Sequence, residues 1–348
     1  MRYGLVALFS ANGGIEGDVG ETKKQVMWFL IGFAVMCVIV ILDYEVLGKL
    51  WKFLFAISTL LLIGVLFTEP INGATSWFNF GGISLQPSEF AKIALILGLG
   101  KLLQKAKEKE KINSIWTLFL LMIFILVPIG LVIMQPDYGT AMVMLVIAGF
   151  MLFVAGLDYR YVLAAIILVV VGVPLAYEYV LPAHAKARID VFLDPQLDPQ
   201  GAGYNIIQAK LAVGSGQMWG MGLLEGNQTQ LGYLPMKVTD FIFAVISEEM
   251  GFVVSSLVVI LFVLLIVRGF SIAKDADDIY GKLIAVGVTS MYLAHFLENV
   301  GMNIGLMPIT GIPLPFISYG GSSMVTNFIG LGLLLNVSSK KSKKLFDY

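Results

Sequence analysis

The sequence contains little charge, one cysteine and two histidines. Only 14% of its 348 residues are charged, whereas a soluble domain has about 25% charged residues. Since 58% of the residues are hydrophobic, a soluble globular protein is excluded and a protein with several membrane spans is predicted. The single cysteine, Cys37, lies in an apolar run, so an intrachain disulfide and a cysteine metal cluster are excluded as well.

Apolar runs close to the roughly 20 residues that a bilayer requires recur along the chain. They predict spans at 26–42, 53–67, 88–104, 115–134, 139–157, 161–180, 241–267, 283–304 and 322–337. The stretch Tyr3–Ala11 is too short to cross, so we expect it to be the outer end of a truncated span or a re-entrant piece. No cleavable signal peptide is expected, because the apolar stretch after Arg2 lacks a small-residue cleavage pattern.

The predicted fold class is therefore all-α. We expect a polytopic membrane protein of about ten transmembrane helices, the first of them truncated, that forms a single domain over residues 1–348. No inverted repeat of the kind found in many transporters is visible in the sequence. A long polar connection, 181–240, precedes the eighth span and is the largest loop.

Lysine and arginine are distributed unevenly between alternate connections. One set of loops includes the basic clusters at 101–111 and 340–344 together with Arg268 and Lys274. The other set contains only a few basic residues: Lys23, Lys24, Lys186, Arg188, Lys210 and Lys237. Because cytoplasmic loops are enriched in basic residues, the first set is assigned to the cytoplasm and the long loop is predicted to face outward.

That outer loop ends with a carboxylate at the start of an apolar run, TDFI at 239–242. An acid at the boundary between water and hydrocarbon is costly to keep without a role, so Asp240 is the first candidate for a functional residue. For Glu248, two turns further along, a buried structural role is favoured over catalysis. Small and polar residues follow on the same helical face and also suit close helix packing: Ala244, Ser247, Gly251 and Ser255.

A second acid opens another span from the outer side, in QPSEFAK at 86–92. Glu89 and Lys92 are three residues apart on one helical face and are predicted to pair. Since an ion pair inside a membrane is expensive, we expect the pair to line a cavity. The alternative is a pair at the membrane interface that only orients the helix.

Other polar residues have structural and functional interpretations that both stay open. Asp137 is either a helix cap or a substrate contact, and residues 307–323, rich in proline and glycine, predict a rigid non-helical plug. One polar face of a later span predicts hydrogen bonding between helices, and its lone histidine does not predict a metal site. The residues of that face are His295, Glu298, Asn299 and Asn303.

The outer loop supplies further candidates for substrate binding. Lys186 and Arg188 are suited to an anionic head group or a pyrophosphate. Gln208, Ser215 and Lys237 are the other candidates in this loop. Its middle, residues 205–213, is amphipathic enough to lie on the membrane surface as a short helix.

Six ordered blocks carry a family resemblance. They are WFNFGGISLQPSEFAK at 77–92, MQPDYGTA at 134–141, RIDVFLDP at 188–195, GSGQMWGMG at 214–222, LGYLPMKVTDFIFAVISEEMGF at 231–252 and NIGLMPITGIPLPFISYGGSS at 303–323. Together they resemble the SEDS family, the RodA, FtsW and SpoVE proteins, over nearly the whole chain. GNQTQLGYLP and GLMPITGIPLPFISYGGSS look closer to RodA than to FtsW.

The resemblance implies ten spans in the bacterial cell (inner or plasma) membrane and polymerisation of lipid II into peptidoglycan strands on its outer face. It implies a class B penicillin-binding protein as partner, within a complex of membrane proteins for cell elongation, and no nucleic acid. It places the family's essential aspartate at Asp240, makes Glu89 and Lys92 candidates for a central cavity, and makes Arg188 a functional contact.

The sequence departs from the family pattern just before TDF. Met236 and Lys237 replace acidic and often histidine-containing residues there. Because a nearby ammonium favours the ionised form of a carboxyl, Lys237 is expected to lower the pKa of Asp240 and so weaken it as a base.

The mechanism expected from these residues is glycosyl transfer with inversion. The GlcNAc 4-hydroxyl of an incoming lipid II attacks the anomeric carbon of the growing chain, and undecaprenyl pyrophosphate leaves. Asp240 takes the hydroxyl proton, while Arg188, Lys186 or a divalent cation such as Mg²⁺ offsets the charge on the leaving group. No other cofactor is expected.

Two rival functions remain for the same residues. One is a flippase for lipid-linked precursors, which would also use charged residues inside spans. The richest polar block lies on one side, however, whereas alternating access needs a site near the midplane. The other is a non-enzymatic scaffold that docks a transpeptidase, which is compatible with catalysis as an added role.

Overall fold

A computed structural model describes residues 2–14, 20–69, 74–81, 83–179, 183–199 and 201–346. The chain divides into two compact units. The first unit comprises Met1–Val19, Leu157–Val259 and Leu297–Ser318, and the second comprises Gly20–Gly156, Ile260–Phe296 and Tyr319–Tyr348. The single-domain organisation expected from the sequence stays a prediction, and each unit is described by itself.

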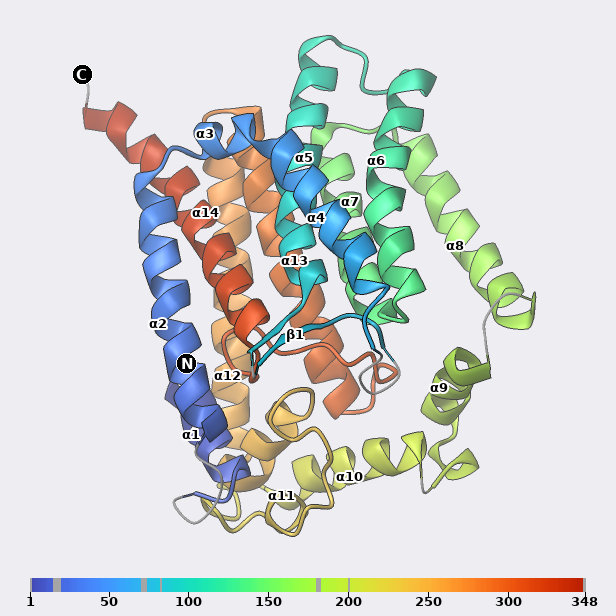
Figure 1. Ribbon diagram of the computed structural model, residues 1–348, viewed down its shortest axis with the longest axis vertical. Helices are drawn as coiled ribbons and strands as arrows, with labels where there is room; N and C mark the ends of the chain where they lie inside the picture. The colour runs from blue at the N-terminus through green and yellow to red at the C-terminus, as the bar shows by residue number, and fades with distance from the viewer. Residues whose placement is uncertain are drawn as a thin grey trace. The chain divides into compact units, whose positions relative to one another are not determined.

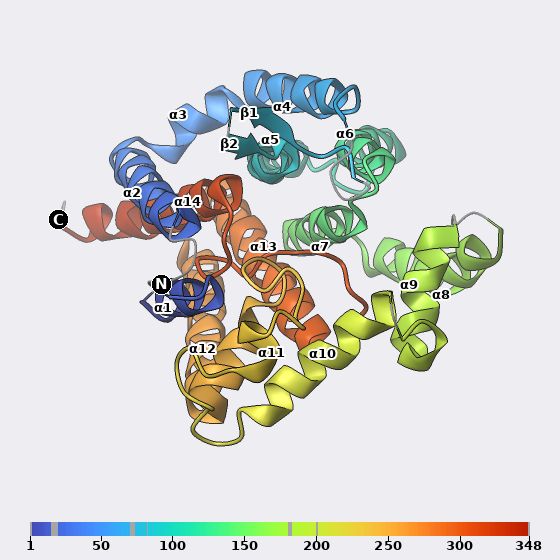
Figure 2. The ribbon, with the colours of Figure 1, turned by 60° about the horizontal axis from the view of Figure 1, so that its bottom comes forward.

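The described residues are mostly helical, which confirms the predicted all-α class. The helices are α1 (Arg2–Ala11), α2 (Gly20–Ile41), α3 (Tyr44–Lys49), α4 (Trp51–Val65), α5 (Pro87–Glu108), α6 (Ile115–Met134), α7 (Tyr138–Ala155), α8 (Tyr159–Tyr179), α9 (Ala183–Leu193), α10 (Ala202–Ser215), α11 (Asn227–Gln230), α12 (Ile242–Asp275), α13 (Ile279–Asn303) and α14 (Gly321–Phe346), with a 3-10 turn η1 (Pro195–Leu197). A short antiparallel pair, β1 (Phe78–Phe80) and β2 (Ile83–Leu85), precedes α5, as Figure 2 shows.

Each predicted span coincides with one of these helices. Among the described residues, five helices are long and apolar enough to cross a membrane: α2, α6, α7, α12 and α13. The shorter α4 is also apolar. The chain is therefore a polytopic helical membrane protein, as the apolar runs predicted.

In the second unit, α5 contacts α4, α6, α7 and α14, and α2 packs along α14 (Figure 1). The first half of α5 is buried on nearly every face, and this includes the charged Glu89 and Lys92, so it packs against several neighbours. Glycines permit the closest contacts: a methyl group at Gly98 would come within 2.5 Å of Phe124, and one at Gly100 within 3.0 Å of Tyr280. Small residues thus allow tight helix packing in this unit.

Polar contacts join the predicted cytoplasmic ends of helices in the second unit. The Tyr44 hydroxyl in α3 donates to Asp278, and burial together with this hydrogen bond raises the pKa of Tyr44. The Asn336 amide of α14 donates to the Ile39 carbonyl of α2 at 2.6 Å. Lys340 of α14 pairs with Glu45 at 2.7 Å. The contacts of Asn336 and Lys340 fix α14 against α2 and α3.

In the first unit, α12 is interrupted at Gly251, which has a φ of 73°. The sequence predicted an unbroken span at 241–267, and this prediction was wrong at Gly251. A break inside a membrane leaves backbone groups without partners unless other protein groups supply them. Here the loop 217–222, within the GSGQMWGMG block, supplies them.

The bonds across this break run in both directions. The amides of Met221 and Gly222 donate to the carbonyls of Glu248 and Glu249 at 2.9 and 3.1 Å, and those of Phe252 and Val253 donate to Gln217 and Met218 at 2.8 and 3.2 Å. The backbones approach so closely that a side chain at Gly251 would collide with the Gly220 amide. A Cβ at Gly216 or Gly220 of the block would likewise collide with the carbonyl oxygen of Ser247 or of Glu249, so these glycines have a structural role.

The outer loop is largely helical. α9, η1 and α10 lie next to one another (Figure 2). The range of α10 confirms the helix predicted at 205–213. Residues 304–320, which include left-handed Gly305 and Gly311, contain no helix. This confirms the predicted non-helical segment as far as residue 320, whereas residues 321–323 of that prediction belong to α14. The segment lies beside the start of α12.

Candidate active site

Asp240 lies two residues before the start of α12 and is half-buried. Its backbone carbonyl accepts hydrogen bonds from the side-chain amides of Asn299 at 2.9 Å and Asn303 at 3.1 Å. Its N–H donates to the Met236 carbonyl at 3.1 Å. The two asparagines are one helical turn apart on α13, so α13 holds the Asp240 backbone from one side.

Asn303 also secures the first turn of α12. Its Oδ1 accepts from the Ala244 amide at 3.1 Å, and this is one of the N–H groups that a helix start leaves without an intrahelical partner. Asn299 donates in addition to the Ile312 carbonyl at 2.7 Å. The predicted hydrogen bonding between helices is thus confirmed for Asn303, whereas Asn299 bonds to two non-helical segments.

The segment 304–320 approaches Asp240 from another side. The Ser318 hydroxyl donates to the Thr239 carbonyl at 2.6 Å and accepts from the Leu314 amide at 2.8 Å. The position of a Cβ at Gly311 would be 3.6 Å from Oδ2 of Asp240. The carboxylate therefore lies next to a glycine, which has no side chain to cover it on this side.

Lys237 lies in the same turn region as Asp240. Its ammonium donates to the Thr229 carbonyl at 2.9 Å. Burial lowers the pKa of Lys237, and Glu249 partly opposes this effect. Lys237 thus stabilises the loop that leads into α12, while its expected influence on Asp240 stays a prediction.

Glu248 is buried and accepts three hydrogen bonds from the start of α11. The donors are the amides of Gln228 and Thr229, at 2.7 and 3.0 Å, and the Thr229 hydroxyl at 2.6 Å. The neighbouring Glu249 accepts from the Gln230 side chain at 2.9 Å. These contacts confirm the structural role predicted for Glu248.

A second polar cluster lies in the second unit. Lys92 is fully buried, with its ammonium 2.8 Å from Glu89 and 2.7 Å from Nε2 of His295. Because a charged ammonium only donates hydrogen bonds, Nε2 is the acceptor and the histidine proton is on Nδ1. The predicted pairing of Glu89 with Lys92 is confirmed. Its location in a substrate cavity stays a prediction, and the histidine was not expected to join it.

Asp137 is a helix cap. One of its carboxylate oxygens accepts from the Thr140 amide at 3.1 Å, at the start of α7. The other accepts from the Gln86 side chain at 3.0 Å. The capping interpretation is therefore confirmed, and both oxygens have partners in the second unit.

The remaining candidates are distributed along α9 and α10. Lys186 donates to the Glu178 carbonyl at 2.9 Å, and Ser215 donates to the Ala212 carbonyl at 2.9 Å. Oε1 of Gln208 is buried and has no hydrogen-bond partner among the described residues. The backbone of Arg188 belongs to α9, but its side chain lies outside what the structure describes. Substrate roles for these residues stay predictions.

Metal ligands form no cluster in the described ranges of the chain: no three His, Cys, Asp or Glu side chains are grouped so that they could hold an ion. A Mg²⁺ ion bound to phosphates often takes only one or two protein carboxylates. Asp240 is a half-buried carboxylate of this kind, and the Mg²⁺ of the sequence analysis stays a prediction.

The structure thus distributes the predicted site residues over two clusters. Asp240 and Lys237 belong to the first unit, and Glu89 and Lys92 to the second. The supporting roles of Asn299, Asn303 and Ser318 at Asp240 were missed. The polar spacing on α13 indicated hydrogen bonding, but it carried no information about the partner.

Comparisons with known proteins agree with this architecture. The family model for FtsW, RodA and SpoVE, described as a cell cycle protein, matches residues 1–343. The peptidoglycan glycosyltransferase MrdB of Escherichia coli K12 is 34% identical over 97% of this chain and 90% of MrdB. Stage V sporulation protein E of Bacillus subtilis is 39% identical over 97% of this chain and 93% of that protein.

A solved structure agrees as well. One chain of the structure reported as "Structural coordination of polymerization and crosslinking by a peptidoglycan synthase complex" superposes on this protein with a TM-score of 0.81. The two chains are 31% identical, and the match covers 97% of this chain and 95% of that one. Sequence and fold therefore match along nearly the full length of each protein. The chain belongs to the FtsW, RodA and SpoVE family of polytopic membrane proteins.

Proposed function

We propose that this protein is a peptidoglycan glycosyltransferase that polymerises lipid II. The observation that carries the proposal is Asp240, a half-buried carboxylate whose backbone is held by two asparagines of α13 and whose side chain faces Gly311. The relative MrdB, itself named a peptidoglycan glycosyltransferase, aligns over 97% of this chain. A carboxylate on a backbone held in this way suits proton removal from a sugar hydroxyl.

The proposed reaction is an inverting displacement. The GlcNAc 4-hydroxyl oxygen of an incoming lipid II forms a bond to the anomeric carbon of the growing strand. The bond from that carbon to the pyrophosphate oxygen breaks, and its electron pair leaves with undecaprenyl pyrophosphate. Asp240 accepts the hydroxyl proton. A pyrophosphate leaves without protonation, so a second catalytic acid of the kind that glycosidases use is not required.

Basic residues of the outer loop are proposed to meet the pyrophosphate. Arg188 suits this contact because a guanidinium binds phosphate oxygens in a bidentate manner. Lys186 lies two residues away on the same helix, α9. Three other residues are proposed to contact the sugar or peptide parts of the substrate: Gln208, Ser215 and Lys237. Gln208 has a buried acceptor, Oε1, for such a contact. A Mg²⁺ ion bound by the pyrophosphate would neutralise further charge.

The partner proposed is a class B penicillin-binding protein, for cell elongation. The structural relative comes from work on a peptidoglycan synthase complex that couples polymerisation with crosslinking. We propose that the protein acts on the outer face of the bacterial cell membrane. The 181–240 loop would then lie outside, which agrees with the distribution of basic residues.

Product analysis tests the proposed activity. Purified protein is incubated with labelled lipid II, with and without a cognate penicillin-binding protein, and the products are separated by gel. Glycan strands longer than the substrate are expected, and they should be more abundant with the partner. If only unreacted lipid II is recovered under both conditions, while the protein moves lipid II across vesicles, the flippase replaces the polymerase.

The buried cluster of Glu89, Lys92 and His295 gives a separate prediction. Removing one member of a buried ion pair costs about 3–5 kcal/mol, whereas replacing both by apolar residues is often close to neutral. We expect Lys92→Met to lower the thermal stability strongly, and the double variant Glu89→Leu with Lys92→Met to fold normally but polymerise poorly.

The double variant separates the two interpretations of this cluster. Lys105→Met, at an exposed lysine on the same helix, is the control and should behave as wild type. Wild-type polymerisation rates in a stable double variant would show that the pair only orients α5 and has no contact with substrate.

A further inference from the structure

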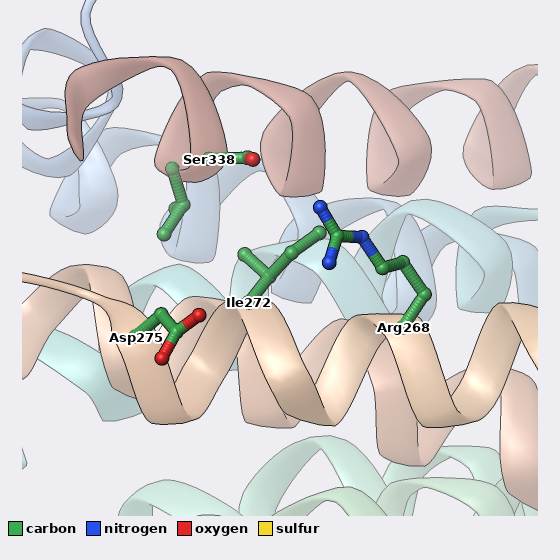
Figure 3. A pocket seen from close by; sticks show the side chains of 5 residues that line it. Arg268, Ile272, Asp275 and Ser338 are labelled. Atoms are coloured by element: carbon green, nitrogen blue, oxygen red, sulfur yellow. The ribbon is translucent and has the colours of Figure 1, made fainter. Parts of the chain in front are cut away.

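The second unit contains an open pocket that the proposed reaction does not use. It is lined by Arg268, Ile272 and Asp275 of α12 and by Val337 and Ser338 of α14 (Figure 3). Its volume is about 380 Å³, counting the space open to solvent. The pocket lies between two helices, at the polar end of an apolar run.

Opposite charges face each other across this pocket. Arg268, Ile272 and Asp275 are four and three residues apart, so they share one face of α12. Figure 3 shows the guanidinium and the carboxylate on either side of Ile272, with Ser338 across from them on α14. The pocket thus offers a cationic end, an anionic end and a hydroxyl between apolar walls.

Arg268 has no hydrogen-bond or ion-pair partner within the part of the chain that the structure describes. It follows the apolar run at 252–267 directly, where a cation without a counterion is unfavourable. The nearby cation of α14, Lys340, is already paired with Glu45 and Asp43. An external anion is therefore the expected partner of Arg268.

The depth of the pocket indicates what that anion is. Arg268 stands where the apolar run of α12 gives way to Lys274 and Asp275, which is the level of the lipid head groups. Basic pockets between helices at this level bind lipid phosphates. The apolar Ile272 and Val337 suit the glycerol and the first acyl carbons.

Asp275 narrows the choice of lipid. A carboxylate beside the phosphate site disfavours a head group that is only anionic, but it suits one that also has a primary ammonium. Arg268 and Asp275 are seven residues apart, about 10 Å along the helix axis, and in Figure 3 their side chains turn toward Ile272 from opposite sides. A carboxylate has several acceptor positions and can take an ammonium beside its contacts within the chain.

We propose that this pocket binds a phosphoethanolamine head group, that of phosphatidylethanolamine. Arg268 and Ser338 bind the phosphate, and Asp275 binds the ammonium. The lipid bridges α12 and α14 and stabilises their packing. Its assignment to the cytoplasmic leaflet rests on the orientation proposed above, but binding does not depend on the polymerase activity.

Lipid binding to the purified full chain tests this proposal. Native mass spectrometry measures retention of palmitoyl-oleoyl phosphatidylethanolamine, phosphatidylglycerol and phosphatidylcholine, each added separately. Wild type is expected to retain phosphatidylethanolamine preferentially, because phosphatidylglycerol lacks the ammonium and a quaternary choline cannot donate a hydrogen bond. Arg268→Gln should weaken binding roughly tenfold, as expected for the loss of a charge-assisted hydrogen bond.

Asp275→Asn should remove the preference over phosphatidylglycerol while leaving phosphate binding. The matched controls are Lys274→Gln and Asp277→Asn, whose side chains are exposed and do not line the pocket. If Arg268→Gln does not fold, Arg268→Lys and Ser338→Ala replace it, and both should bind more weakly than wild type. Equal retention of all three lipids by wild type, or equal binding by pocket and control variants, would overturn the proposal.

Discussion

Asp240→Asn is expected to abolish lipid II polymerisation while leaving the fold intact. Asparagine has nearly the same shape as aspartate but cannot accept the hydroxyl proton. The contacts from Asn299 and Asn303 reach the backbone carbonyl of residue 240, so they survive the substitution. Loss of a general base lowers the rate by roughly 10²–10⁴-fold, which would leave no polymer visible on a gel.

The control for this prediction is Glu225→Gln, which removes a carboxylate from an exposed site in the same outer loop. It should polymerise as wild type does. Thermal unfolding of both variants verifies that the fold is retained. Normal strands from a well-folded Asp240→Asn protein would remove Asp240 from the mechanism and leave the proposed activity without its base.

The second large effect is expected from Asn303→Leu. This substitution removes the hydrogen bonds to Asp240 and Ala244 and keeps the number of side-chain heavy atoms. A buried backbone group left unsatisfied costs about 1–3 kcal/mol, so the melting temperature should fall. The turn that places Asp240 would also shift, and a displacement of about 1 Å can lower the rate roughly 100-fold.

The rate at saturating lipid II distinguishes positioning from stability. Asn303→Asp keeps an acceptor for the Ala244 amide but turns a carboxylate oxygen toward the carbonyls of Asp240 and Asn299, so it should be both unstable and slow. Asn327→Leu removes a buried amide that bonds Ser323 at 3.2 Å in the second unit. It should lower stability without lowering the rate per folded molecule. An Asn303→Leu enzyme with a normal rate per folded molecule would show that Asn303 only stabilises.

The sequence predicted those features of the structure that depend on residues close together along the chain. A bilayer requires a continuous apolar run of fixed length, so hydropathy located the spans. The pairing of Glu89 with Lys92 followed from a spacing of three residues, and the cap at Asp137 from its place before a helix. In the ion pair and in the cap, the two partners lie within one helical turn of each other.

For the outer loop, the sequence predicted a short helix but none of the contacts that the loop makes. The GSGQMWGMG block contributed to the family resemblance, but the break at Gly251 was not predicted. A glycine in an apolar helix is usually a packing site, and the groups that satisfy a broken helix are contributed by another segment. The backbone hydrogen bonds between residues 217–222 and 248–253, which only the structure shows, identify Gly251 as the site of a break.

By itself, then, the sequence determined the helices, their membrane character and the candidate acid, because each depends on residues that are neighbours along the chain. Tertiary structure alone decided how that acid is held: Asn299 and Asn303 reach the Asp240 carbonyl across 59 and 63 residues. It also placed His295 on Lys92, 203 residues away. An amide or an imidazole bonds whichever group packing brings within about 3 Å, and no spacing along the chain encodes which group that is.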